Sequence, residues 1–184
     1  MLFMKPSNCV NLFPPLLLED YFAGKTKGWG LFEDRFGNVR KQFCVDINGF
    51  WNGKELYLEE DFLYSNGETE NRNWVIEKTD TYRYQGTAGD VIGVAFGECS
   101  GNTLCWQYDM KLNISGHLVS VHFTDRMYLQ SDGVILSKAR VSKLGLEIGV
   151  VTLTFMKSLT SGEPDTYIRN ALPIAVEFEQ GSIQ

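Results

Sequence analysis

Apolar and polar residues alternate along most of this chain, and turn residues interrupt the alternation at short intervals. The clearest example is TLCWQYDMKLNI, residues 103–114, in which every second residue from Leu104 to Ile114 is apolar. Residues 43–47 and 119–129 repeat this spacing. A period of two residues is typical of β-strands that bury one face. The pattern therefore predicts a succession of strands.

Turn signals separate these strands at nearly regular spacing. They are RFGN near residue 37, NG at 48, SNG at 65, TAG at 87, CSGN at 100, SG at 115, SDG at 131 and KLG at 143. Asn-Gly and Asp-Gly supply the positive φ values that tight hairpin turns need. Only a short segment, Leu16 to Phe22, suggests a helix, so the crossover helices of a parallel sheet are missing.

The fold class that follows is all-β. We expect an antiparallel up-and-down barrel of about 8 to 10 strands, preceded by a short N-terminal helix or extended segment, because closure leaves no exposed strand edge. A two-sheet sandwich is the alternative. Residues 1–157 would form the barrel domain with its lead-in, and residues 158–184, where the alternation weakens, a C-terminal appendage.

Glycines recur at every fourth position from Gly89 to Gly101. This spacing places them on one side of a strand, where missing side chains allow sharp bending or close approach. They could equally be unrelated strand and turn glycines. Asp90 then precedes the apolar residues Ile92, Val94 and Phe96 in phase.

Composition and charge exclude several functions. The formal net charge of -6 and the pI near 5.0 argue against nucleic-acid binding, which needs a concentrated basic surface. No apolar run reaches the roughly 18 residues of a membrane helix. The four cysteines form no CxxC motif, and the two histidines point to opposite faces of one strand. We therefore assign no metal, cofactor or catalytic residue. Cys99 and Cys105 could face each other across a hairpin or remain buried thiols.

Charged residues occupy positions in phase with the apolar set, where an ordinary core would be apolar. Glu60 and Arg72 flank the SNG turn, so they should stand opposite each other or one diagonal apart. Asp90 and Asp125 also share the phase of apolar neighbours. We expect all four to point inward. One interpretation is simple neutralisation of Glu60 by Arg72.

The other interpretation is a ligand site inside the barrel. Concave sites combine apolar walls with a few polar groups that orient the ligand. The candidate binding residues are those predicted to line the interior with the charged groups: Glu60, Arg72, Trp74, Tyr64, Trp106, Tyr108 and Asp125. The expected ligand is a small lipid or other apolar molecule.

Four stretches of the chain resemble a known family: YFAGKTKGWGLFEDRFGNVRKQF, LYLEEDFLYSNGETENRNW, YQGTAGDVIGVAFGECSGNTLCWQYDMKL and VHFTDRMYLQSDG. The family is DUF3833, a group of uncharacterised bacterial proteins that are often regarded as lipoproteins. The resemblance extends from about residue 16 to 157 and implies a lipocalin-like barrel with no established activity. It suggests the cell envelope or periplasm, but no lipobox or signal peptide is visible around Cys9, so the compartment stays open.

Three functional hypotheses follow. The first is a noncatalytic binding module with an apolar ligand in its interior. The second is an enzyme of lipid or envelope metabolism that uses the same charged cluster as acid and base. The third is a scaffold that has no ligand and contacts a protein partner through its outer wall or its C-terminal tail.

Overall fold

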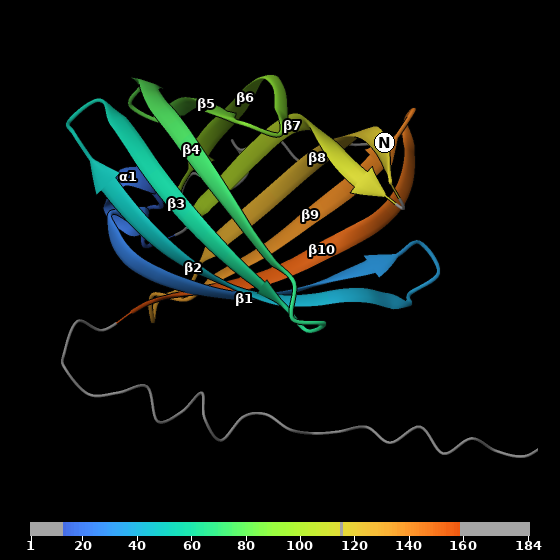
Figure 1. Cartoon of the computed structure of the whole chain (residues 1–184). Coiled ribbons are helices and arrows are strands. Elements are labelled where there is room, and N and C mark those ends of the chain that lie inside the picture. The colour runs from blue at the N-terminus through green and yellow to red at the C-terminus, as the bar shows by residue number, and fades with distance from the viewer. Residues whose placement is uncertain (1–12, 115, 159–184) are drawn as a thin grey trace, which may run out of the picture.

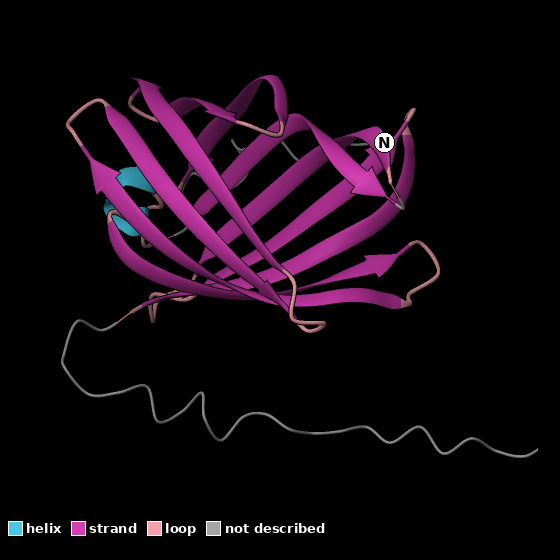
Figure 2. Ribbon diagram, viewed as in Figure 1, coloured by secondary structure: helices cyan, strands magenta, loops and turns pink. Residues whose placement is uncertain are grey.

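The computed structural model describes residues 13–114 and 116–158 and contains one short helix and ten strands (Figures 1 and 2). The elements are α1 (Leu18–Phe22), β1 (Gly24–Asp34), β2 (Val39–Trp51), β3 (Glu55–Tyr64), β4 (Thr69–Asp80), β5 (Arg83–Ala88), β6 (Val91–Ser100), β7 (Thr103–Ile114), β8 (His117–Leu129), β9 (Ile135–Lys143) and β10 (Leu146–Lys157).

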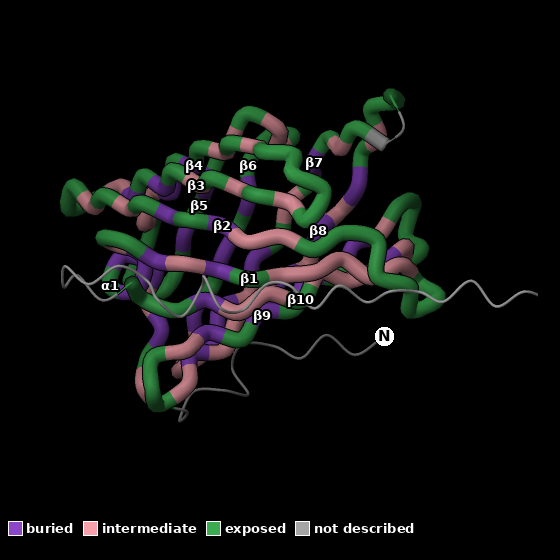
Figure 3. Tube along the Cα trace, turned by 60° about the horizontal axis from the view of Figure 1, so that its bottom comes forward, coloured by how far each residue is buried: buried purple, intermediate pink, exposed green. Residues whose placement is uncertain are grey.

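The ten strands form one closed antiparallel barrel. Each strand pairs with its neighbours in sequence, and β1 closes the barrel by pairing with β10. The predicted all-β, up-and-down, lipocalin-like barrel is confirmed, and the two-sheet sandwich is wrong. The alternating pattern agrees with this closure: Figure 3 shows buried and exposed residues alternating along the strands, as expected when one face of every strand points inward.

Helix α1 closes one end of the barrel, which we call the helix end. Leu18, Tyr21 and Phe22 are buried in the apolar core at this end. The Tyr21 hydroxyl lies 2.8 Å from the Gly133 carbonyl oxygen and 3.1 Å from that of Phe155, and it is the donor toward both. The helix is thereby fixed to the loop before β9 and to the end of β10.

A buried polar group also anchors α1. Glu19 is buried, forms an ion pair with Lys78 of β4 and accepts a 2.7 Å hydrogen bond from the Tyr84 hydroxyl of β5. Burial raises the pKa of Glu19, but the hydrogen bonds from Lys78 and Tyr84 outweigh it, and the net shift is downward. The carboxylate is therefore satisfied in its ionised form.

One predicted turn is wrong. Asn48 and Gly49 lie inside β2, and the chain turns instead at Asn52 and Gly53, where Gly53 has a φ of 99°. Gly49 serves a different purpose, since a Cβ there would lie 1.8 Å from the carbonyl oxygen of Phe22. The glycine allows α1 to approach the wall of the barrel.

The predicted phase of residues 89–101 is also wrong. Gly89 and Gly101 lie outside β6, and a register irregularity between Ile92 and Phe96 interrupts its pairing with β7. Gly93, with a φ of 74°, lies within this irregularity. The buried residues of β6 are consequently Ala95, Gly97 and Cys99, whereas Ile92, Val94 and Phe96 are exposed.

Cys99 and Cys105 do not form a disulfide across the β6–β7 hairpin. Cys99 is buried and lies opposite Leu104, whereas Cys105 lies opposite Glu98 on the other face. Within residues 13–114 and 116–158, no helix is long and apolar enough to cross a membrane. Cys9 and residues 159–184 fall outside the described residues, and the division into a barrel domain and an appendage remains a prediction.

Candidate functional site

Two apolar clusters occupy the barrel interior. The larger includes the buried residues of α1 together with Trp74 and Trp106, and the smaller is formed by β7, β8 and β9 around Met110 and Phe123. Tyr108 packs against both clusters. The charged residues predicted to point inward, Glu60, Arg72, Asp90 and Asp125, lie on elements from β3 to β8. Together with neighbouring polar side chains they form a polar cluster that interrupts the apolar core.

Among the described residues, Arg72 of β4 is the only cation that forms ion pairs with the carboxylates of this polar cluster. Its Nε lies 2.8 Å from Asp90 Oδ2, and its Nη2 lies 2.8 Å from Glu70 Oε1. Its Nη1 is 3.9 Å from Glu60 Oε2. Each nitrogen of the guanidinium therefore faces a different carboxylate. Burial lowers the pKa of Arg72, but the carboxylates of Glu60 and Asp90 outweigh it, and Arg72 stays charged.

Glu60 of β3 stands directly opposite Arg72 in the strand register, as predicted. The simple pairing interpretation needs correction, however, because Glu60 makes the longest of the three Arg72 contacts. Burial raises the pKa of Glu60 to about 7. The positive charge of Arg72 lowers this pKa, and the negative charge of Asp90 raises it. Burial thus favours the neutral form of the Glu60 side chain more than water does.

Asp125 of β8 lies beside Tyr108 of β7. The Tyr108 hydroxyl donates to Asp125 Oδ2 at 3.3 Å. The other carboxylate oxygen, Oδ1, is buried and has no hydrogen-bond partner among the described residues. Burial raises the pKa of Asp125 to about 7, while the Tyr108 hydroxyl and Arg72 act in the opposite direction. Burial and the neighbouring Asp125 charge likewise raise the pKa of Tyr108, so its hydroxyl stays protonated.

Aromatic contacts show that these side chains meet across the interior. The Trp74 ring of β4 lies 5.5 Å from the Tyr108 ring and 5.9 Å from the Trp106 ring, both on β7. Strands β5 and β6 separate β4 from β7 in the sheet, so these contacts pass through the barrel. Trp106 also lies against Gly86 and Gly97, where an added Cβ would come within 2.8 Å and 2.1 Å of its ring.

Tyr64 and Glu70 extend the polar cluster toward the turn between β3 and β4. The Tyr64 hydroxyl donates to Glu70 Oε2 at 2.8 Å. Burial raises the pKa of Tyr64, and Glu70 raises it further by accepting the hydrogen bond. The Arg72 guanidinium also lies 5.1 Å from the centre of the Phe62 ring.

The structure thus brings together all seven residues predicted from the sequence to bind a ligand. Trp74 and Trp106 are largely core residues beneath the polar cluster, and the others form part of it. Glu70 was not predicted from the sequence, although it shares the two-residue phase of Arg72 and Trp74. Asp90 does reach the interior, but from the turn between β5 and β6 and not as part of the expected apolar face.

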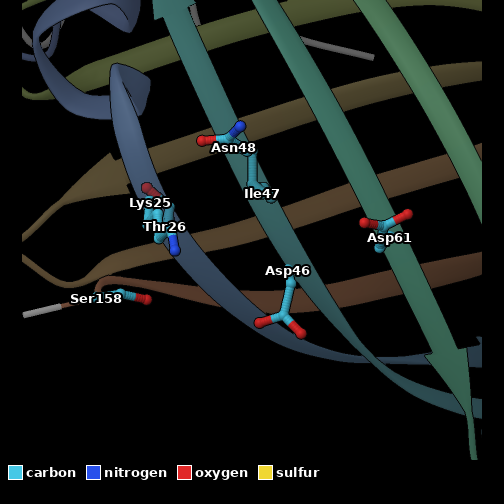
Figure 4. A pocket seen from close by; sticks show the side chains of 7 residues that line it. All are labelled: Lys25, Thr26, Asp46, Ile47, Asn48, Asp61 and Ser158. Carbon is cyan, nitrogen blue, oxygen red and sulfur yellow. The ribbon is translucent and has the colours of Figure 1, made fainter. Parts of the chain in front are cut away.

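A separate hollow of about 200 Å³ lies on β1, β2 and β3 near Ser158 (Figure 4). Its lining residues are Lys25, Thr26, Asp46, Ile47, Asn48, Asp61 and Ser158. It contains none of the residues of the polar cluster. The described residues contain no group of three or more His, Cys, Asp and Glu side chains arranged to hold a metal ion.

The barrel with a helix at one end and a polar cluster in its interior defines a lipocalin-like protein. The chain belongs to the family described as "Protein of unknown function (DUF3833)", whose model matches residues 3–157. Among solved structures, it is similar to the S-type phycobiliprotein lyase CPES from Guillardia theta, with a TM-score of 0.56 and 8% identity over 79% of this chain and 95% of that chain. This likeness shows the fold alone. The comparison with curated proteins found no match.

Proposed function

We propose that this protein is a noncatalytic binding module that holds one small, largely apolar molecule inside its barrel. The polar cluster, made of Glu60, Tyr64, Glu70, Arg72, Asp90, Tyr108 and Asp125, would orient the polar group of this molecule. Apolar walls with a few convergent polar groups are the usual composition of such sites. The likeness to the phycobiliprotein lyase concerns the fold alone and is compatible with this proposal.

The observation that carries the proposal is the partial exposure of the charged side chains around Arg72. The side chains of Glu60 and Arg72 share the phase of buried apolar residues on their strands, yet 14% and 16% of their surfaces remain exposed. Tyr108 is also only partly buried, although it packs against both apolar clusters. Solvent therefore reaches the polar groups, whereas a core filled by its own side chains would bury them fully.

Two measurements test the proposal. Native mass spectrometry of the purified chain should show an additional mass that organic extraction removes. The emptied protein should then show a saturable change in tryptophan fluorescence when titrated with ten-carbon amphiphiles, because Trp74 and Trp106 lie beside the polar cluster. Absence of both a bound species and saturable binding would contradict the binding function.

A matched pair of variants locates the site. Ala88 of β5 is partly buried, lies opposite Trp74 and packs on the interior, whereas Thr87 next to it is exposed. Ala88→Phe should fill interior space and weaken binding at least tenfold, and Thr87→Phe should leave binding unchanged. Equal effects of the two substitutions would place the ligand outside the barrel.

An enzyme remains the second candidate, because carboxyl groups with pKa values near 7 suit acid–base chemistry at neutral pH. Glu60 and Asp125 have this property. Mass analysis of the extracted molecule after prolonged incubation distinguishes the two: a binding module returns it unchanged, and an enzyme converts it. The scaffold hypothesis uses either the outer wall of the barrel or the residues after 158, and the latter lie outside the described residues. Pull-down with and without that segment tests which of the two contacts a partner.

A further inference from the structure

The polar cluster contains more acid than base. Arg72 supplies one positive charge, and four carboxyl groups surround it or lie close by: Glu60, Glu70, Asp90 and Asp125. The three guanidinium nitrogens each face one of the first three carboxylates. A carboxylate ligand would have to displace one of these partners and would add a like charge to the cluster, which is unfavourable in a poorly solvated site.

The same cluster has hydrogen-bond acceptors without donors. Asp125 is 7% exposed, and its Oδ1 atom is buried without a hydrogen-bond partner among the described residues. Asp90 Oδ1 is in the same situation. A buried acceptor without a partner costs about 1 to 3 kcal/mol. A ligand with several N–H donors would supply the missing partners, and an ammonium group carries three such donors.

The surrounding aromatic rings also favour a cation. Tyr108 stacks on Phe123 with ring centres 5.0 Å apart and meets Trp74 edge to face. Arg72 already lies over Phe62. Tryptophan and tyrosine faces attract cations, and the attraction is strongest where water is excluded. A second cation near Tyr108 would thus have aromatic neighbours as well as the free oxygen of Asp125.

We propose that the barrel interior selects an amphiphile with a primary ammonium or similar cationic head group and discriminates against a carboxylate of equal chain length. This proposal rests on the binding function proposed above. The ammonium would lie beside the buried Oδ1 atom of Asp125, and the alkyl chain would extend along the apolar interior.

The experiment compares decylamine, decanol and decanoate at pH 8, where an alkylamine is protonated and a fatty acid is ionised. Binding is followed by tryptophan fluorescence below the critical micelle concentration. We expect the amine to bind at least ten times more tightly than the carboxylate, with the alcohol between them. Equal or tighter binding of decanoate would overturn the cationic selectivity and leave the binding function intact. Absence of binding by all three would overturn both.

Asp125→Asn tests the assigned contact. The substitution keeps the shape of the side chain but removes its charge, so the preference for decylamine over decanol should fall about tenfold. Asp109→Asn is the matched control, because Asp109 is exposed on the neighbouring strand. An unchanged amine-to-alcohol ratio in a folded Asp125→Asn protein would refute the contact, and the ratio in the unmodified protein tests the selectivity independently of any variant.

Discussion

Removal of the Arg72 charge provides a direct test of the polar cluster. Arg72→Met keeps a long apolar side chain and leaves Glu60, Glu70 and Asp90 without their shared cation. At an effective dielectric constant of about 20, each 2.8 Å contact corresponds to about 6 kcal/mol of gross attraction, much of which desolvation offsets. Removing one partner of a buried ion pair costs about 3 to 5 kcal/mol.

The partial exposure of two partners places the expected loss at the lower end of this range. The side chain of Glu70 is 40% exposed and that of Asp90 is 29% exposed, so water screens the charges that remain. We expect a loss of about 3 kcal/mol in the free energy of unfolding at pH 8. For a domain of this size, such a loss lowers the melting temperature by roughly 6 to 12 °C.

Urea unfolding followed by tryptophan fluorescence measures this loss at pH 8 and pH 5. The loss should be smaller at pH 5, because the carboxylates left without Arg72 take up protons. Arg83→Met is the control, since Arg83 is 64% exposed and lies 3.6 Å from Glu98; its effect should stay within about 0.5 kcal/mol. A loss below about 1 kcal/mol for Arg72→Met, or an equal loss at both pH values, would refute the cluster described here.

Two further predictions concern pH and packing. The pKa of Glu60 is raised from 4.5 to about 7 in the folded chain, so its contribution to stability is complete below pH 4.5 and is lost as pH rises to about 7. In urea unfolding, Glu60→Gln should reduce the fall in the free energy of unfolding over this pH range. The same substitution at exposed Glu59 should leave that fall unchanged. Gly97→Ala should lower the free energy of unfolding by about 1 to 3 kcal/mol, because the added Cβ would lie 2.1 Å from the Trp106 ring. Gly89→Ala is the control, since Gly89 has open space around it. Equal stability of the two variants would contradict the packing of Trp106 on Gly97.

The barrel was largely predictable because its determinants are local. A period of two residues identifies strands, and hairpin turns connect sequence neighbours, so antiparallel pairing follows without knowledge of distant contacts. The same local logic placed Glu60 opposite Arg72, since the turn between β3 and β4 fixes their register. Glu70 was predictable by this rule as well, because it lies two residues before Arg72 on the same face.

The errors arose where distant contacts decide the local conformation. Asn48 and Gly49 have the sequence of a turn, but Gly49 is needed in a straight strand because α1 approaches it. The irregularity around Gly93 changes which residues of β6 face inward, and its position depends on pairing with β7. The partners of Arg72 also required the structure, because the Asp90 contact joins β4 to the turn after β5.

Stability alone does not favour a polar cluster of this kind over an apolar core. Apolar side chains of similar volume often replace buried ion pairs without loss, and sometimes with a gain in stability. Here one guanidinium also faces more carboxyl groups than it can neutralise, and two buried carboxylate oxygens have no donor among the described residues. A ligand that brings donors and positive charge would relieve both costs in the bound state. The features that make this interior unfavourable when empty are therefore the ones that would give it affinity for a cationic amphiphile.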